Sequence, residues 1–297
     1  MTSPIGFVLV TYKNPQQINR LVGKLNEMFD YPPIACHHDF FKSELRTDTF
    51  GNNFLLVRPH ILTGWGVFAV VDAMLKALEL LYERLDSPDW FVFLSEADYP
   101  IKPARTILED LASSPYDAHM RHEKIIYNNY ERDWQRSCFK RYCTLKYELP
   151  FLNRRLQYTR LTLSIEHPLL TSAALPFSKD FHCFAGEHWF CANRKAAEYL
   201  IEFHKAEPAL AKHYRRMDPF SVVPEESYYH TVLCNARDLT ISNNNWRYVD
   251  WSEGGSRPKV LSVEDMPQLE GSTAHFARKF DIDRDSKILN ELDDVTK

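Results

Sequence analysis

Apolar segments alternate with amphipathic segments along the first hundred residues of the chain. Strands that alternate with helices and are apolar throughout are typical of a parallel sheet covered on both faces. The pattern therefore predicts an α/β fold with a central, mostly parallel sheet flanked by helices. Apolar runs predict strands at 5–12, 32–39, 53–59 and 89–100, and helical spacing of apolar residues predicts helices at 14–29 and 64–85.

The pattern changes at about Ser114. The segment from there to Asp180 is basic, aromatic and weakly periodic, which predicts an irregular lobe or a helical insertion. Regular structure returns from Phe181, with a strand followed by a helix from about Arg194. The sequence shows no internal repeat and no low-complexity tract.

Polar residues follow each predicted strand. Ligands of such sheets bind beyond the carboxyl ends of the strands. A nucleotide or nucleotide-sugar site is therefore one interpretation of these residues, and ordinary solvation of strand ends is the other. Neither a Walker loop nor a GxGxxG motif follows the first strand, which disfavours a mononucleotide cradle or a dinucleotide-binding fold. The four strand ends are Thr11-Tyr12-Lys13, His37-His38-Asp39, Arg58-Pro59-His60 and Glu96-Ala97-Asp98.

The fourth strand end is the most acidic of the four. Glu96 and Asp98 stand where an α/β enzyme that uses a nucleotide-sugar would hold a metal ion, so a metal site is one alternative. The other alternative is that these carboxylates contact a donor or anchor the loop. His37 and His38 also invite a metal interpretation, but neighbouring residues of a strand point to opposite faces and do not easily share one ion.

Composition narrows the classes of function. The 297 residues carry 36 basic and 40 acidic side chains, a net charge of −4, which is too balanced for a general nucleic-acid or membrane surface. The six cysteines form no CxxC pair, so we expect reduced, buried thiols. The sequence has neither a signal-peptide pattern nor a run as long as a transmembrane helix. We expect a cytoplasmic protein, or one peripheral at the inner face of a membrane.

Seven segments stand in order along the chain: "HHDF", "GWG", "FLSEADYPIKP", "GEHWFCANRKAAEYL", "PEESYYHTVL", "RYVDWSEGGSRPKVL" and "STAHFARKFD". Together they resemble the core-2/I-branching β-1,6-N-acetylglucosaminyltransferases and the related peptide O-xylosyltransferases of glycosyltransferase family 14. The chain is similar to a bacterial-type member. The resemblance implies a single GT-A catalytic domain over 1–297, with a divergent acceptor-side segment at about 115–180.

The same resemblance implies an inverting transfer of a sugar from a UDP-sugar to a hydroxyl of a glycan acceptor. The expected donor is UDP-N-acetylglucosamine first and UDP-xylose second. The expected acceptor is a cell-envelope or capsule glycan, a lipid-linked sugar or a small saccharide. A non-catalytic protein that binds a glycan or a nucleotide is the alternative from another class, and it would show neither transfer nor donor hydrolysis.

The family pattern places the catalytic base on Glu226, in "VPEESYYHTVL". Inversion needs one base that takes the acceptor proton during in-line attack. Glu225 is expected to be its neighbour and to cap the following helix. Acidic residues after a proline are also what an ordinary helix start prefers, so a purely structural role for both is the alternative.

Basic residues near the C-terminus are implied to stabilise the departing diphosphate. Lys279 and Arg257 are the matching candidates, with Arg278 close by. Fixed cations can take the place of Mn²⁺ because they form charge-assisted hydrogen bonds with phosphate oxygens. We therefore expect no metal or other cofactor. Ordinary surface basic residues are one alternative, and an Mn²⁺-dependent enzyme that uses Glu96 and Asp98 is the other.

The remaining site residues are also assigned by the resemblance. Asp39 is expected to contact the uracil or ribose, and Asp98 to belong to the donor site. Trp65 is expected beneath the donor site or in the core. The acceptor side is expected to include Glu187 and Trp189, in "GEHW", and aromatic rings that stack on a sugar or pack ordinarily: Trp246, Tyr248 and Trp251.

Overall fold

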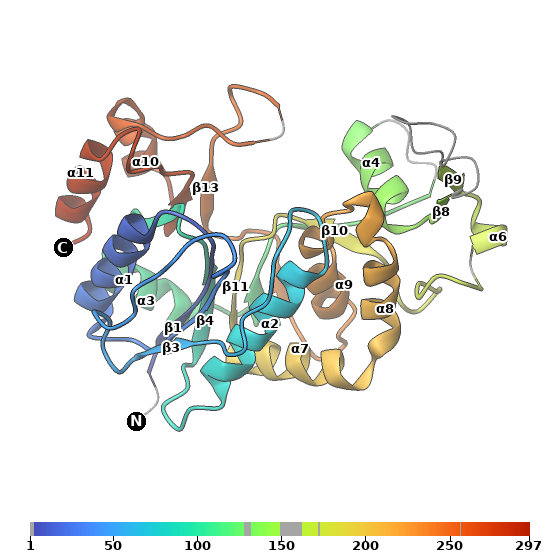
Figure 1. The fold of residues 1–297 in the computed structure, drawn as a ribbon, viewed down its shortest axis with the longest axis horizontal. Coiled ribbons are helices and arrows are strands. Elements are labelled where there is room, and N and C mark those ends of the chain that lie inside the picture. Colours follow the sequence, from blue (N-terminus) through green and yellow to red (C-terminus); the bar gives the residue numbers. More distant parts are fainter. Residues whose placement is uncertain (1–2, 128–131, 149–161, 172, 256) are drawn as a thin grey trace.

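A seven-stranded sheet lies at the centre of the computed structural model, which describes residues 3–127, 132–148, 162–171, 173–255 and 257–297 (Figure 1). Its strand order is β12-β6-β11-β4-β1-β2-β3. Only β11 runs antiparallel to its neighbours among the described pairs of this sheet. The predicted α/β fold with a mostly parallel central sheet is confirmed. The strands are β1 (Ile5–Thr11), β2 (Ile34–His38), β3 (Phe54–Leu56), β4 (Trp90–Leu94), β6 (Ala118–His119), β11 (Cys191–Asn193) and β12 (Ile241–Ser242).

Helices cover both faces of this sheet, because its central strands are apolar on both sides. Successive side chains of a strand point to opposite faces. Accordingly, Phe7 and Leu9 of β1 pack in one hydrophobic core, whereas Val8 packs in the other. Helices α1 (Pro15–Phe29), α3 (Ala104–Ser113), α10 (Met266–Gly271) and α11 (Lys287–Val295) bury residues in the first core, and α2 (Ala69–Tyr82), α7 (Arg194–Ala206), α8 (Pro208–Arg216) and α9 (Tyr228–Cys234) bury residues in the second.

The predicted helix at 64–85 begins later than its apolar pattern indicates. Gly66 has a φ of 75°, a left-handed conformation that favours glycine, so the chain turns there instead of continuing as a helix. The backbone N–H of Val223 donates a hydrogen bond to the carbonyl of Gly66 at 3.3 Å, which ties this turn to a distant segment. The turn leaves Trp65 76% exposed, so Trp65 is not a core residue.

A three-stranded sheet extends the fold beyond the end of β4. It consists of β13 (Arg247–Val249), β14 (Phe276–Arg278) and β5 (Asp98–Pro100), in the order β13-β14-β5. A fully buried ion pair joins Arg247 Nη1 to Asp98 Oδ1 at 3.2 Å, and Arg247 Nη2 donates a hydrogen bond to the carbonyl of Phe93 at 3.0 Å. The ion pair therefore joins β13 to β5 within the small sheet, and the hydrogen bond to Phe93 fixes that sheet to the carboxyl end of β4.

The basic segment at about 115–180 forms short elements beside this core. They are β7 (His122–Lys124), α4 (Asp133–Tyr142), β8 (Leu145–Glu148), β9 (Thr162–Ile165) and α6 (Pro168–Thr171), and β7 pairs with β10 (Phe184–Gly186). Residues 128–131, 149–161 and 172 of the segment lie outside the described residues.

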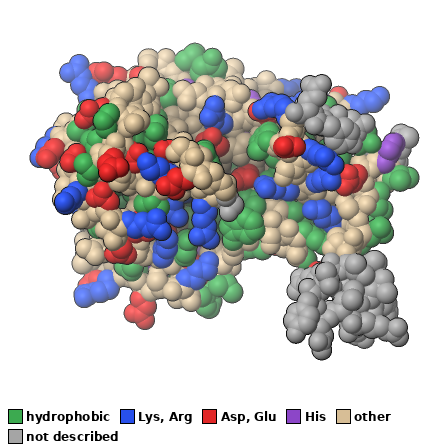
Figure 2. All heavy atoms as spheres, turned by 90° about the horizontal axis from the view of Figure 1, so that it is seen from above, with side chains coloured by type: hydrophobic (Ala, Val, Ile, Leu, Met, Phe, Trp, Pro, Cys, Tyr) green, Lys and Arg blue, Asp and Glu red, His purple; other side chains and the backbone are tan. Residues whose placement is uncertain are grey.

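Two expectations from composition can be compared with the structure. All six cysteines are free, and all but the partly exposed Cys234 are buried, as expected. The face shown in Figure 2 intermingles acidic and basic side chains, in agreement with a net charge of −4.

In the part of the chain that the structure describes, no helix combines the length and the apolar character needed to span a bilayer.

Arg247→Ala should destabilise the fold strongly, because it leaves Asp98 as an uncompensated charge in a buried position. Removal of one partner from a buried ion pair typically costs about 3–5 kcal/mol, and urea denaturation at neutral pH would measure this loss. Arg105→Ala is the control: Arg105 bonds Glu109 on the exposed face of α3, and its loss should leave the midpoint unchanged. A wild-type denaturation midpoint for Arg247→Ala would contradict the stabilising role of the buried ion pair with Asp98.

Candidate active site

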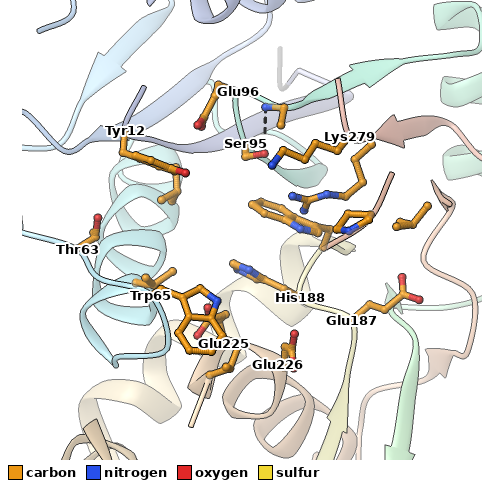
Figure 3. Close-up of a pocket in the computed structure, with 18 of the residues that line it drawn as sticks. Tyr12, Thr63, Trp65, Ser95, Glu96, Glu187, His188, Glu225, Glu226 and Lys279 are labelled. Carbon is orange, nitrogen blue, oxygen red and sulfur yellow. Dashed lines mark hydrogen bonds between the residues drawn. The ribbon is translucent and has the colours of Figure 1, made fainter. Parts of the chain in front are cut away.

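A cavity of about 460 Å³ opens at the carboxyl ends of β1 and β4, where the strand order predicts a ligand site (Figure 3). Each part of its lining comes from a different segment of the chain. Its lining includes Tyr12 and Lys13 after β1, Ser95, Glu96 and Ala97 after β4, the turn at Thr63, Gly64 and Trp65, the segment Glu187, His188 and Trp189, the pair Glu225 and Glu226, and Arg278 and Lys279 after β14.

Basic side chains meet at one end of this cavity. Burial lowers the pKa of Lys279, and the positive charges of Lys13, Arg278 and Arg257 lower it further. The Arg278 guanidinium lies over the Trp189 ring, 4.3 Å from its centroid. Its Nε and Nη1 are buried and find no hydrogen-bond partner among the described residues. Donors that are charged, buried and unpaired suit the oxygens of a phosphate.

Of the predicted cations, Lys279 and Arg278 line the cavity and Arg257 does not. Arg257 is exposed, although it lies close enough to lower the pKa of Lys279. A direct contact between Arg257 and a ligand stays a prediction.

Glu96 and Asp98 have different surroundings despite their closeness in sequence. Glu96 is 2% exposed, and burial raises the pKa of its carboxyl to about 7, against the opposing effect of Lys13 and Arg278. Asp98 does not line the cavity. Its Oδ2 accepts hydrogen bonds from the backbone N–H and the hydroxyl of Ser95, at 2.8 and 2.5 Å, and its Oδ1 faces Arg247. Asp98 therefore anchors the loop after β4, and its contact with a donor stays a prediction.

Metal-binding side chains are also sparse at this loop. Across the described ranges, no group of three or more His, Cys, Asp or Glu residues is placed to hold a metal ion. His37 Nε2 accepts a hydrogen bond from the backbone N–H of Ile61, whereas His38 contacts Thr11 and Ser43. The two histidines thus have separate partners, as expected for neighbours in a strand.

Glu225 and Glu226 occupy the opposite end of the cavity from Lys279 in Figure 3, whereas Glu96 lies on the side of the cations. Glu226 ends the short 3₁₀ helix η2 (Pro224–Glu226), and its side chain is 40% exposed. Burial raises the pKa of Glu226, the nearby Glu187 raises it further, and Arg141 lowers it. Arg141 Nη1, on α4, lies 3.3 Å from Glu226 Oε2. The arrangement is that of an accessible carboxyl group whose ionised form is favoured by one cation, Arg141, against the effects of burial and of Glu187.

The predicted capping role of Glu225 is wrong. Helix α9 begins at Tyr228 with Ser227 as N-cap, and no side chain caps it. Glu225 is instead 7% exposed and lines the cavity, with no hydrogen-bond partner for its Oε2 among the described residues. The 3₁₀ turn at Pro224–Glu226 causes this, because it directs Glu225 into the protein before the α-helix starts.

The predicted acceptor residues divide into three groups. Glu187, Trp189 and the half-exposed Trp251 line the cavity. Tyr248 is partly buried on β13 and lies outside the lining. Trp246 stacks between His119 and His275, with ring centroids 3.7 and 4.2 Å away, so the packing alternative holds for Trp246.

Asp39 is fully buried and lies behind the cavity wall. Its Oδ2 accepts hydrogen bonds from the backbone N–H and hydroxyl of Thr63, at 2.8 and 2.7 Å, and lies 3.3 Å from Lys42 Nζ. Because Thr63 and Trp65 line the cavity, Asp39 positions that wall. Its contact with uracil or ribose stays a prediction.

A family model described as Branch: Core-2/I-Branching enzyme matches residues 5–270. The chain belongs to the core-2/I-branching enzyme family. The mostly parallel sheet with its flanking helices is the GT-A type fold that the resemblance implied.

Curated relatives of this core-2/I-branching family member are similar to it at low identity. Beta-glucuronosyltransferase GlcAT14A of Arabidopsis thaliana is 26% identical over 260 residues, which cover 86% of this chain and 53% of that protein. Xylosyltransferase 1 of Rattus norvegicus is 24% identical over 313 residues, covering 97% of this chain and 35% of that protein. Xylosyltransferase oxt of Drosophila melanogaster is 23% identical over 306 residues, covering 94% and 32%. The chain spans about half the length of the glucuronosyltransferase and about a third of the xylosyltransferases.

Sequence reasoning gave no individual role to several residues of the site. Lys13 was placed at a strand end on the ligand-binding edge of the sheet, but it was not among the predicted cations. Arg141 gave no signal, because its partner Glu226 is 85 residues away. His188 stands in the motif segment "GEHW" but was given no role; burial lowers its pKa well below the ordinary value, and its neutral ring stacks on Trp189.

Arg141→Met should raise the pKa of Glu226 further, because it removes the cation that stabilises the ionised carboxylate. A titration of the Glu226 carboxyl carbon by ¹³C NMR, assigned by its loss in Glu226→Gln, would show the midpoint at higher pH. Arg132→Met, which removes a cation paired with Glu123 in the same segment, should leave that midpoint in place. An unchanged or lower midpoint in Arg141→Met would argue against the contact.

Proposed function

We propose that this chain is an inverting glycosyltransferase that moves a sugar from a UDP-sugar to a hydroxyl of a glycan acceptor. The observation that carries the proposal is the separation of charge across one cavity. Glu226 stands at one end as the base, and Lys13, Arg278 and Lys279 stand at the other as the cations for the diphosphate.

The two ends suit the two partial reactions of an inverting transfer. Glu226 takes the proton of the acceptor hydroxyl while the hydroxyl oxygen attacks the anomeric carbon from the face opposite the diphosphate. The bond from that carbon to the phosphate oxygen breaks, and its electron pair leaves with UDP. The fixed cations stabilise the charge that develops on the diphosphate. Arg141 supports the reaction because it favours the ionised form of the base.

The relatives support sugar transfer and broaden the choice of donor. Their names describe transfer of a glucuronosyl or a xylosyl group. UDP-xylose therefore gains support relative to UDP-N-acetylglucosamine, the donor that the sequence resemblance put first.

We also propose that the reaction needs no metal ion. The support is that Lys279 and Arg278 provide charge where the diphosphate would lie, whereas the Asp98 carboxylate is already bound by Ser95 and Arg247. Fixed guanidinium and ammonium groups can make the same charge-assisted contacts with phosphate oxygens that a metal ion would.

Glu226→Gln should remove transfer while leaving UDP binding nearly intact, since glutamine keeps the shape of the side chain but accepts no proton. Loss of a general base typically lowers the rate by about 10²–10⁴-fold. UDP release from UDP-xylose and UDP-N-acetylglucosamine, with a panel of glycan acceptors, would measure the rate, and calorimetry the affinity for UDP. Glu202→Gln, at an exposed position of α7, is the matched control. Normal turnover by Glu226→Gln would contradict the assignment of Glu226 as the catalytic base.

Lys279→Ala should weaken UDP binding, because it removes a charge-assisted hydrogen bond to the diphosphate. Such a bond is typically worth about 1.5–3 kcal/mol, so the Kd for UDP should rise by about tenfold to hundredfold. Calorimetry at fixed ionic strength measures this, with Lys76→Ala on the exposed face of α2 as the control. An affinity that changes equally in both variants would show that Lys279 is an ordinary surface lysine.

A further inference from the structure

Glu225 is a buried carboxyl group for which the proposed reaction has no use. It lines the cavity next to the base, is 7% exposed, and caps no helix. Its Oε2 finds no hydrogen-bond partner among the described residues. A buried polar atom without a partner is costly, so a carboxyl group kept in this position needs a partner that the protein itself does not supply.

The surroundings of Glu225 make it a donor as well as an acceptor of hydrogen bonds. Burial raises the pKa of its carboxyl to about 8, the charge of Glu226 raises it, and Arg141 opposes the rise. Near neutral pH the group therefore carries a proton for much of the time. A protonated carboxyl can donate one hydrogen bond and accept others, which matches the hydroxyl groups of a sugar.

The charges at this end of the cavity limit which sugar can lie there. Glu225, Glu226 and Glu187 all line it. The cations of the described residues at this end are already paired, Arg141 with Glu226 and Arg121 with Glu187, and the buried His188 is neutral. A carboxylate on the sugar ring would meet acidic groups without a free cation, and like charges placed together cost binding energy.

The remaining cations of the cavity stand elsewhere. Lys42, on the strand-end side, lies 3.3 Å from Asp39 Oδ2 and donates a hydrogen bond to Thr63. Lys13, Arg278 and Lys279 form the end that the diphosphate would occupy. A sugar bound between the diphosphate and Glu226 therefore lies beside the carboxyl group of Glu225 and meets no unpaired basic residue of the described chain.

We propose that Glu225 binds hydroxyl groups of the donor sugar and restricts the donor to an uncharged sugar, of the xylose or N-acetylglucosamine class, against glucuronate. The inference rests on the proposed function and deepens it. It separates this chain from the glucuronosyltransferases to which it is similar and groups it by donor with the xylosyltransferases.

Binding of UDP, UDP-xylose, UDP-N-acetylglucosamine and UDP-glucuronate to the full chain, measured by calorimetry at pH 7, tests the proposal. The wild-type chain should bind at least one uncharged donor about three- to tenfold tighter than UDP, the gain expected from one or more hydrogen bonds. It should bind UDP-glucuronate no tighter than UDP. This comparison needs no variant, so a folding defect cannot obscure it. Tighter binding of UDP-glucuronate than of both uncharged donors would overturn the proposal.

Variants then separate recognition from structural support. Glu225→Ala should lose the gain for the uncharged donor while its Kd for UDP stays at the wild-type value, and Glu225→Gln, which keeps hydrogen-bonding atoms, should retain most of the gain. Glu202→Gln should match wild type for every ligand. An Ala variant that weakens UDP and UDP-sugars equally would show a structural role and overturn the inference.

The outcomes also distinguish the two proposals. No binding of UDP to the wild-type chain would end the proposed function and this inference together. Normal UDP binding and loss of turnover in Glu226→Gln, combined with a preference for UDP-glucuronate, would end only the inference about Glu225.

Discussion

The buried ion pair between Arg247 and Asp98 is the contact on which the candidate site depends. It joins β13 to the first residue of β5, the strand that follows the loop after β4, with both side chains removed from water. In the same sheet Arg278 lies directly opposite Asp98 in the register of β14 and β5. The pair therefore sets where Arg278 and Lys279 stand relative to the central sheet. A buried pair is a weak source of stability, but it is a strict constraint on position, because neither charge can be left alone.

With the small sheet held in this position, the order of the elements along the chain places cations at one end of the cavity and carboxylates at the other. The cations come from the end of β1 and from the end of β14, near opposite ends of the sequence, and the carboxylates facing them come from η2 and from Glu187 after β10. Burial shifts the pKa of Glu226 toward the neutral form of its carboxyl, and Arg141 opposes that shift. Catalytic groups are commonly tuned in this way. The same logic assigns Glu225, which forms no ion pair among the described residues and whose pKa burial raises to about 8, to the neutral part of the site.

The sequence was most informative where local pattern decides structure. Apolar runs predicted the strands β1 to β4, and a proline at the first turn predicted the start of α1 at Pro15. The motif segments predicted Glu226, Lys279 and Trp189 as site residues, and all three line the cavity. Reasoning from sequence failed where a long-range contact decides. Apolar spacing alone predicted a helix through Gly66. In the structure the backbone turns at Gly66 instead, and the hydrogen bond from Val223 holds that turn.

The carboxylates show the same division. Asp39 and Asp98 lie at strand ends as predicted, but their oxygens are bound by Thr63 and Arg247, contacts that no local pattern reveals.

Fixed side-chain cations acting on a diphosphate remain the centre of the account, and the affinity of UDP measured by calorimetry in EDTA and again in Mn²⁺ tests it most directly. The account predicts the same Kd in both. Binding that is lost in EDTA and restored by Mn²⁺ would contradict it.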